Sequence, residues 1–154
     1  MNANGRELIL KEEVFAVVGG AIEVLNTLGD GLHEKVYENA LCVEFRLRDI
    51  AHSQQEKHRI IDKGEVVGEY VPDVVVQKAL VVDTKTIERI TDHERGQMLN
   101  YLRITGLPVG VILNFKHARL EWERLVLSKE PRINTNKRES GAEAADFHAP
   151  EKRP

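Results

Sequence analysis

The chain has almost no cysteine, no long hydrophobic segment and no excess of positive charge, and each absence excludes a class of protein. Cys42 is the single cysteine among 154 residues, so an internal disulfide and a cysteine-based zinc cage are excluded. No apolar run reaches the roughly eighteen residues that a membrane-spanning helix needs. The first residues, MNANGRELILKEEV, lack the apolar segment of a secretion signal. We therefore expect a cytoplasmic protein that does not enter membranes.

The charge balance is slightly acidic. The formal net charge is −3, whereas nucleic-acid-binding domains are often strongly basic. This counts mildly against nucleic-acid binding, although one basic groove on an acidic body can still hold a short stretch of backbone. The hydrophobic content of 42% suffices for one core in a chain of this length. We expect one domain over 1–127 and a disordered polar tail over 128–154, where the apolar pattern ends.

Apolar residues that recur every three or four positions predict helices over 7–28 and 32–49. The glycine-containing segment LGDG separates the two helices. In the second helix one stripe is especially regular and predicts the core-facing side. It consists of Leu32, Val36, Ala40, Val43, Leu47 and Ile50.

The rest of the pattern predicts strands with one further helix. Strands are expected over 53–62, 65–76, 80–86, 109–115 and 120–127. A helix is expected to begin at Thr91, a capping residue, and to run to Thr105, where Gly106 and Pro108 stop it. The order ααβββαββ predicts an α/β fold bordering on α+β, with a mixed β-sheet flanked by helices.

The segment YVPDVVVQKALVVDTKT, residues 70–86, reads as a valine-rich hairpin that carries Asp73, Asp83 and Lys85. With a three-residue turn at 77–79, Asp73 faces Asp83 at a β-carbon separation of about 5 Å. Two carboxylates this close repel each other unless something positive lies between them. That can be Lys85 or a divalent cation with oxygen ligands. From the hairpin alone, a solubilising edge or a plain salt bridge is the favoured interpretation.

The spacing PD…DTK resembles the PD-(D/E)XK motif of the restriction-endonuclease-like nuclease superfamily. Two further matches accompany it. GLHEKVYENAL (31–41) is similar to the signature of the GxxExxY protein family within that superfamily, and QMLNY (97–101) is similar to the QxxxY element of RecB-type nucleases. The likeness covers roughly residues 14–127 and implies a restriction-endonuclease-like core. One departure is Asp83, where the family usually has glutamate.

The resemblance implies metal-dependent hydrolysis of a phosphodiester bond in DNA or RNA. Asp73, Asp83 and Glu34 would hold Mg²⁺ or Mn²⁺, and Lys85 would orient the attacking water or offset charge on the phosphate. Gln97 would contact a metal-bound water or the scissile phosphate. Supporting positions are Tyr37, Tyr101 and His93. Structural alternatives stay open for Glu34, as a first-turn helix acid, for Tyr37, as a packing residue, and for Gln97, as a surface residue.

The alternative function is a non-catalytic nucleic-acid-binding or assembly module that retains the nuclease fold. The intact acid, acid, X, Lys set favours catalysis, because a binding module does not need it. The acidic net charge favours the alternative, because nonspecific affinity comes mostly from phosphate neutralisation. A homodimer is a further expectation, since small nucleases often act in pairs on the two strands.

Overall fold

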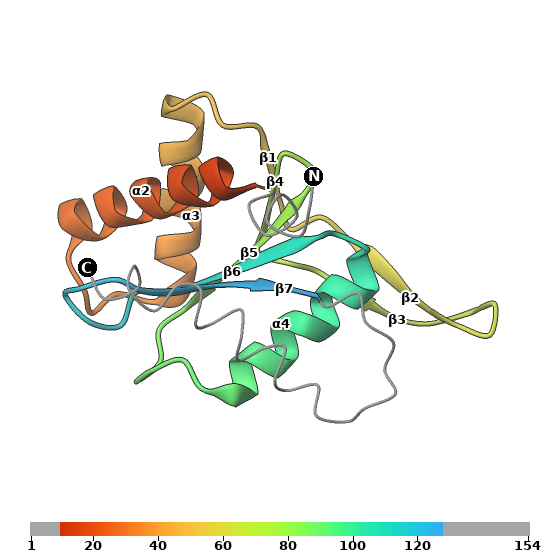
Figure 1. The fold of residues 1–154 in the computed structure, drawn as a ribbon. Helices are drawn as coiled ribbons and strands as arrows, with labels where there is room; N and C mark the ends of the chain where they lie inside the picture. The colour runs from red at the N-terminus through yellow and green to blue at the C-terminus, as the bar shows by residue number, and fades with distance from the viewer. Residues whose placement is uncertain (1–9, 128–154) are drawn as a thin grey trace.

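Residues 10–127 are described by a computed structural model, in which helices cover both faces of a sheet (Figure 1). The first two helices, α2 (Lys11–Leu28) and α3 (Glu34–Leu47), pack on one face, and α4 (Asp92–Thr105) packs on the other. The predicted tail 128–154 lies outside the described residues. Each face of the sheet has its own apolar cluster, so the site described below lies in a three-layer body.

The main sheet has five strands in the order β1-β4-β5-β6-β7. They are β1 (His52–Gln54), β4 (Val74–Val76), β5 (Leu80–Lys85), β6 (Val109–Asn114) and β7 (Glu121–Val126). The central pair β5 and β6 is parallel, and the other pairs are antiparallel. A separate antiparallel hairpin, β2 (His58–Asp62) with β3 (Glu65–Tyr70), extends away from the body (Figure 1). The predicted class, a mixed sheet flanked by helices, is confirmed.

The predicted number of strands was too low. Five strands, and not three, lie between α3 and α4, because both of the first two expected strands are interrupted. Gln55 has a left-handed backbone (φ 60°) between β1 and β2, and Pro72, which has no N–H to donate, lies between β3 and β4. At these two points the chain leaves the main sheet and returns to it, which creates the separate hairpin.

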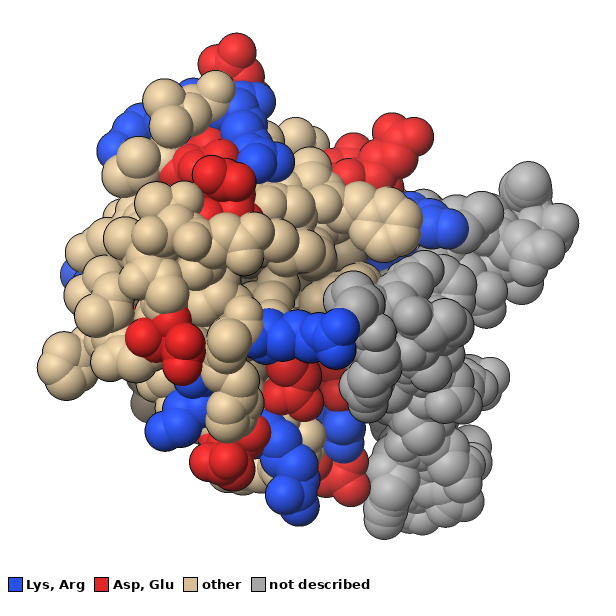
Figure 2. All heavy atoms as spheres, turned by 90° about the vertical axis from the view of Figure 1, so that its left-hand side faces the viewer, with Lys and Arg blue, Asp and Glu red and all other residues tan. Residues whose placement is uncertain are grey.

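The core-facing side of α3 was predicted wrongly. The buried residues are Tyr37, Glu38, Leu41, Cys42 and Phe45. Four of the six stripe residues are exposed, with Leu47 at 76%, and only Ala40 and Ile50 pack at the edge of the core. Both sides of α3 carry apolar residues at helical spacing, so periodicity could not tell which side the sheet and α2 would cover. On the side of the molecule where α2 and α3 lie, a broad uncharged area separates charges above and below it (Figure 2).

The third helix agrees with its prediction. Thr91 caps α4: its hydroxyl accepts a hydrogen bond from the backbone N–H of His93 (3.2 Å), and Glu94 accepts from the backbone N–H of Thr91 (2.7 Å). Gly106 ends the helix with a left-handed backbone (φ 75°). The position of α4 along the chain is therefore set by local chemistry.

The single cysteine lies in the core. Burial, together with the charge of Glu38, raises the pKa of the Cys42 thiol to about 11. Cys42 therefore lies in the core as a thiol, with little tendency to form the reactive thiolate. Within residues 10–127, none of the helices is long and apolar enough to cross a membrane.

Candidate active site

The acidic residues of the hairpin meet near the carboxyl end of β5. The register of β4 and β5 pairs Val76 with Leu80 and Val74 with Val82, as the three-residue turn predicted. Gln77 and Lys78 make that turn with left-handed backbones (φ 53° and 55°). Asp73 directly precedes β4, so it lies beside the end of β5 that carries Asp83 and Lys85.

Asp73 is held by the middle residue of the DTK sequence. The backbone N–H of Thr84 and its hydroxyl both donate to Oδ2 of Asp73, at 2.8 and 2.9 Å. The backbone N–H of Gln55 donates to the carbonyl of Asp73 at 3.1 Å. Sequence reasoning missed the hydroxyl of Thr84. The available signal was a threonine just after the apolar start of β5 and next to Asp83, because a fully buried hydroxyl needs a partner.

Asp83 lies on the α4 side of the sheet and is only 9% exposed. The ammonium of Lys85 approaches its Oδ2 at 3.3 Å. Burial raises the pKa of Asp83 to about 7, with Lys85 lowering it and Asp73 raising it further. A single cation on a long side chain thus compensates this carboxylate incompletely, and the pair of aspartates retains an excess of negative charge.

Lys85 remains a cation in this setting. Burial alone would lower the pKa of its ammonium, but Asp83, by charge and by a hydrogen bond, and also Tyr101 and Glu34, raise the pKa above that of an ordinary lysine. A general base at neutral pH needs the opposite shift. The surroundings of Lys85 therefore favour a role as a positive charge over a role as a proton acceptor.

Glu34 is brought to the same place from α3. Partial burial, Asp73 and Glu38 raise the pKa of its carboxyl group, while Lys85 and the backbone of Thr86 lower it. Glu34 keeps contact with solvent. Over residues 10–127, no three Asp, Glu, His or Cys side chains converge tightly enough to form a ready-made metal cage. The pair Asp73 and Asp83 is therefore the centre of the site, and Glu34 lies at its margin.

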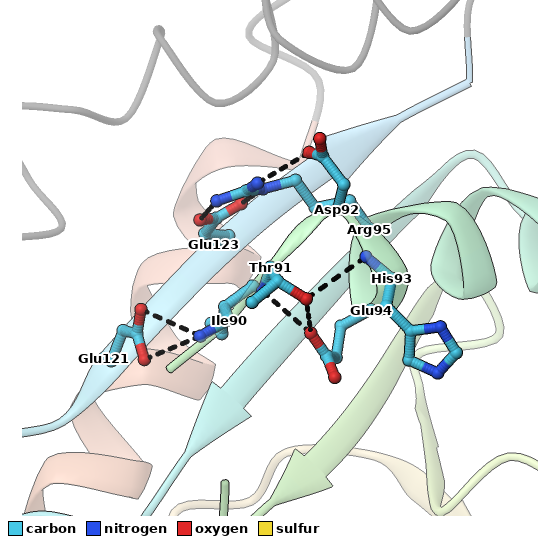
Figure 3. A network of polar contacts seen from close by, with 8 residues as sticks. All are labelled: Ile90, Thr91, Asp92, His93, Glu94, Arg95, Glu121 and Glu123. Atoms are coloured by element: carbon cyan, nitrogen blue, oxygen red, sulfur yellow. Dashed lines mark hydrogen bonds and ion pairs between the residues drawn. The ribbon is translucent and has the colours of Figure 1, made fainter. Parts of the chain in front are cut away.

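Residues of α4 reach the site unequally. The ring of Tyr101 stacks on Tyr70 of β3, and the pKa of Tyr101 is raised by burial and by Asp83. Gln97, one turn earlier, is half-buried, and no hydrogen bond or ion pair joins it to any of the described acids. The ring of His93 is exposed and points away from the neighbouring polar network (Figure 3). The structure thus brings Tyr101 to the site, but not His93.

A polar network fixes the loop between β5 and α4. Asn114 of β6 accepts from the backbone N–H of Ile87 (3.0 Å) and donates to the carbonyl of the same residue (2.8 Å). Glu121 of β7 accepts from the backbone N–H of Ile90 at 3.1 and 3.2 Å (Figure 3). These bonds hold the chain that connects Lys85 to the start of α4.

Arg95 belongs to this scaffold. Its guanidinium donates to both carboxylate oxygens of Glu123, each at 2.7 Å, and to Asp92 at 2.8 Å (Figure 3). Glu123 is 2% exposed, so the pair is a bidentate anchor of α4 on the sheet.

Tyr37 is a core residue. Its ring is fully buried and stacks on Phe115 with centroids 4.7 Å apart. The hydroxyl donates to the carbonyl of Gly29 (2.6 Å) and accepts from the backbone N–H of Leu32 (3.1 Å). Tyr37 therefore shapes the turn before Glu34, and the packing alternative describes it.

Sequence reasoning also missed a buried acid beside the site. Glu38 is buried in α3 and accepts from the side-chain amides of Gln54 (2.9 Å) and Gln55 (2.7 Å) and from Lys35 (3.2 Å). The backbone of Gln55 also contacts Asp73. Glu38 thus ties α3 to the segment that bears the first aspartate of the site.

Residues 11–125 match the PD-(D/E)XK nuclease superfamily. The chain belongs to that superfamily. A comparison with curated proteins found no match. The crystal structure of SSO0001 is similar in fold, with a TM-score of 0.50, 14% sequence identity, and coverage of 97% of this chain and 73% of that chain. The superfamily assignment is confirmed, and membership of the GxxExxY family stays a prediction.

Proposed function

We propose that this protein is a metal-dependent nuclease that hydrolyses phosphodiester bonds in DNA or RNA. The observation that supports this most is the placement of Asp73, Asp83 and Lys85 together at the carboxyl end of β5. In a member of the PD-(D/E)XK superfamily, these are the residues of the motif itself. GxxExxY membership, with Glu34 and Tyr37 at its named positions, is part of the same proposal.

The donor set fits a hard divalent cation. Carboxylate oxygens are the ligands that Mg²⁺ and Mn²⁺ prefer. Asp73 raises the pKa of both Asp83 and Glu34, so the three acids share a region that is short of positive charge. We assign Asp73 and Asp83 as ligands, with Glu34 contributing directly or through a bound water. When bound, the cation would polarise the phosphate and lower the pKa of a coordinated water.

The chain's own side chains supply the remaining roles. Lys85, as an ammonium ion, offsets charge that builds on the phosphate and orients the attacking water. Thr84 keeps the carboxylate of Asp73 in one orientation through its two hydrogen bonds. Gln97, one turn from Tyr101 on α4, contacts the phosphate or a water once the substrate is bound.

A cleavage assay tests the proposal. Purified protein is incubated with labelled single-stranded DNA, duplex DNA and RNA in the presence of Mg²⁺, Mn²⁺ or EDTA. We expect cleavage with metal and none with EDTA. Asp73→Asn and Asp83→Asn should each abolish cleavage, because each removes a metal ligand. Asp62→Asn is the matched control, since Asp62 is an exposed aspartate on β2 outside the site.

Metal binding is measured separately from cleavage. Mn²⁺ should raise the melting temperature of the wild type and of Asp62→Asn, and should leave Asp83→Asn unchanged. Cleavage that persists in EDTA, or in both site variants, would refute the proposal. Oligonucleotide binding without any cleavage would instead support the alternative, a binding module that retains the nuclease fold.

A further inference from the structure

Two of the three tyrosines in the chain lie beside the candidate site. Tyr70 ends β3 and Tyr101 lies on α4, and their rings stack with centroids 4.0 Å apart and an interplanar angle of 16°. Burial raises the pKa of both tyrosines, and the negative charge of Asp83 raises it further. Both also keep part of their surface exposed. The pair is thus an aromatic surface next to the carboxylates.

The third tyrosine, Tyr37, has a purely structural environment. Tyr37 is 0% exposed and its hydroxyl has two backbone partners within the loop before α3. Among the described hydrogen bonds, none involves the hydroxyl of Tyr70 or Tyr101. Core packing and two hydrogen bonds thus account for Tyr37, whereas Tyr70 and Tyr101 stack on each other and stay partly exposed.

The charge of this protein provides little electrostatic affinity for a phosphate backbone. The formal net charge of the chain is −3, and within residues 10–127 five Lys or Arg side chains already pair with acids, among them Lys85 with Asp83 and Arg95 with Glu123. A protein that neutralises few phosphates needs another source of affinity, and a base stacked on an aromatic ring provides one that tolerates any sequence.

We propose that Tyr70 and Tyr101 together form the platform on which a nucleobase next to the scissile phosphate stacks. This inference rests on the proposed nuclease function and specifies its substrate class. A base inside a duplex has both faces covered by its neighbours, so the platform requires an unstacked base. The substrate is therefore single-stranded nucleic acid or a frayed end. Tyr70, which belongs to none of the sequence motifs, becomes a specificity residue carried by the β2–β3 hairpin.

Binding to two probes of equal length and charge tests the platform. One is a fluorescently labelled twelve-nucleotide oligothymidine, and the other is an abasic oligomer of the same length. Binding is measured in EDTA, so that cleavage does not interfere. The wild type should bind oligothymidine about tenfold more tightly than the abasic oligomer, the size expected for one stacked base. It should also prefer oligothymidine to a duplex of the same length.

Variants assign the preference to the tyrosine pair. Tyr70→Leu should bind both single-stranded probes equally, whereas Tyr70→Phe, which keeps the ring, should retain the preference. Phe15→Leu is the matched control, because Phe15 is an aromatic residue of α2 that is 42% exposed. The salt dependence should be shallow, with log Kd changing by less than about two per decade of salt, as expected for few neutralised phosphates.

The outcomes separate this inference from the proposed function. A wild type that binds both single-stranded probes equally overturns the platform, whatever the variants do. A folded Tyr70→Leu protein that keeps the preference also overturns it. Metal-dependent cleavage without the preference would leave the nuclease proposal standing alone. A preference that depends on Tyr70, without any cleavage, would support the platform and refute the nuclease.

Discussion

Two buried acids on the α4 side of the sheet differ in how their charge is compensated. Glu123 receives two short hydrogen bonds from the planar guanidinium of Arg95, at 2.7 Å each. Asp83 receives one contact from Lys85 at 3.3 Å and has another carboxylate, Asp73, nearby. The ion pair of Arg95 and Glu123 is fully compensated and anchors the structure. The two aspartates, Asp73 and Asp83, repel each other, and a bound cation can relieve that repulsion. In this fold, charge compensation distinguishes the scaffold from the site better than burial does.

Breaking the satisfied pair should have the largest effect on stability. Arg95→Ala leaves the buried carboxylate of Glu123 without its main partner. We expect a loss of about 3 kcal/mol in the free energy of unfolding, measured by urea denaturation. The control is Arg103→Ala. Arg103 is an exposed arginine of the same helix, and its side chain donates a hydrogen bond to Asn100. Equal losses in both variants would contradict the distinction.

Relieving the undercompensated pair should have the opposite effect on stability. Asp83→Asn removes one of two repelling charges, so the metal-free protein should be at least as stable as the wild type. The same change should lower the cleavage rate at least about a hundredfold, because a cation's stabilisation of the transition state is worth several kcal/mol. A variant that is both destabilised and fully active would show that Asp83 is a scaffold residue like Glu123.

The pH dependence of stability sharpens the comparison. Asp83 has a pKa of about 7 in the folded protein, above the ordinary aspartate value of 3.8. The folded state therefore binds more protons than the unfolded state between these values. The contribution of this group is favourable below about pH 4 and is lost as the pH rises to 7. In EDTA, the melting temperature of the wild type should fall over this interval more steeply than that of Asp83→Asn.

The smallest expected effect concerns the orientation of Asp73. Thr84→Val keeps the shape of the side chain and removes the hydroxyl that donates to Oδ2 of Asp73. We expect a loss of about 1 kcal/mol in stability and a measurable fall in cleavage rate. Thr84→Ser keeps the hydroxyl and should retain more of the activity. If valine and serine behave alike in the cleavage assay, the hydroxyl does not position Asp73.

The regions that were predicted correctly are those in which local chemistry decides. The turn at 77–79 gave the register of β4 and β5, because a hairpin pairs the residues on either side of its turn. Thr91, Glu94 and Gly106 gave the limits of α4, because capping groups lie next to the ends they cap.

The regions that were missed or misread depend on partners distant in sequence. Most of the apolar stripe of α3 points to solvent because α2 and the sheet cover the side that bears Tyr37 and Phe45. Arg95 is a structural residue only because Glu123, on the last strand of the sheet, faces it. Tyr70 meets Tyr101 because the separate hairpin returns to α4. None of these partners can be read from neighbouring residues.

The sequence by itself determined the motif residues, the hairpin that carries them and the class of fold. The motif residues follow from the resemblance to a known superfamily. The hairpin and the class of fold follow from apolar periodicity and from turn and cap chemistry, which act over a few residues. Only the tertiary structure decided which acids are compensated, which side of α3 is buried and which aromatic rings meet beside Asp83. Compensation and burial depend on the sum of contacts from several elements, and that sum exists only once the chain has folded.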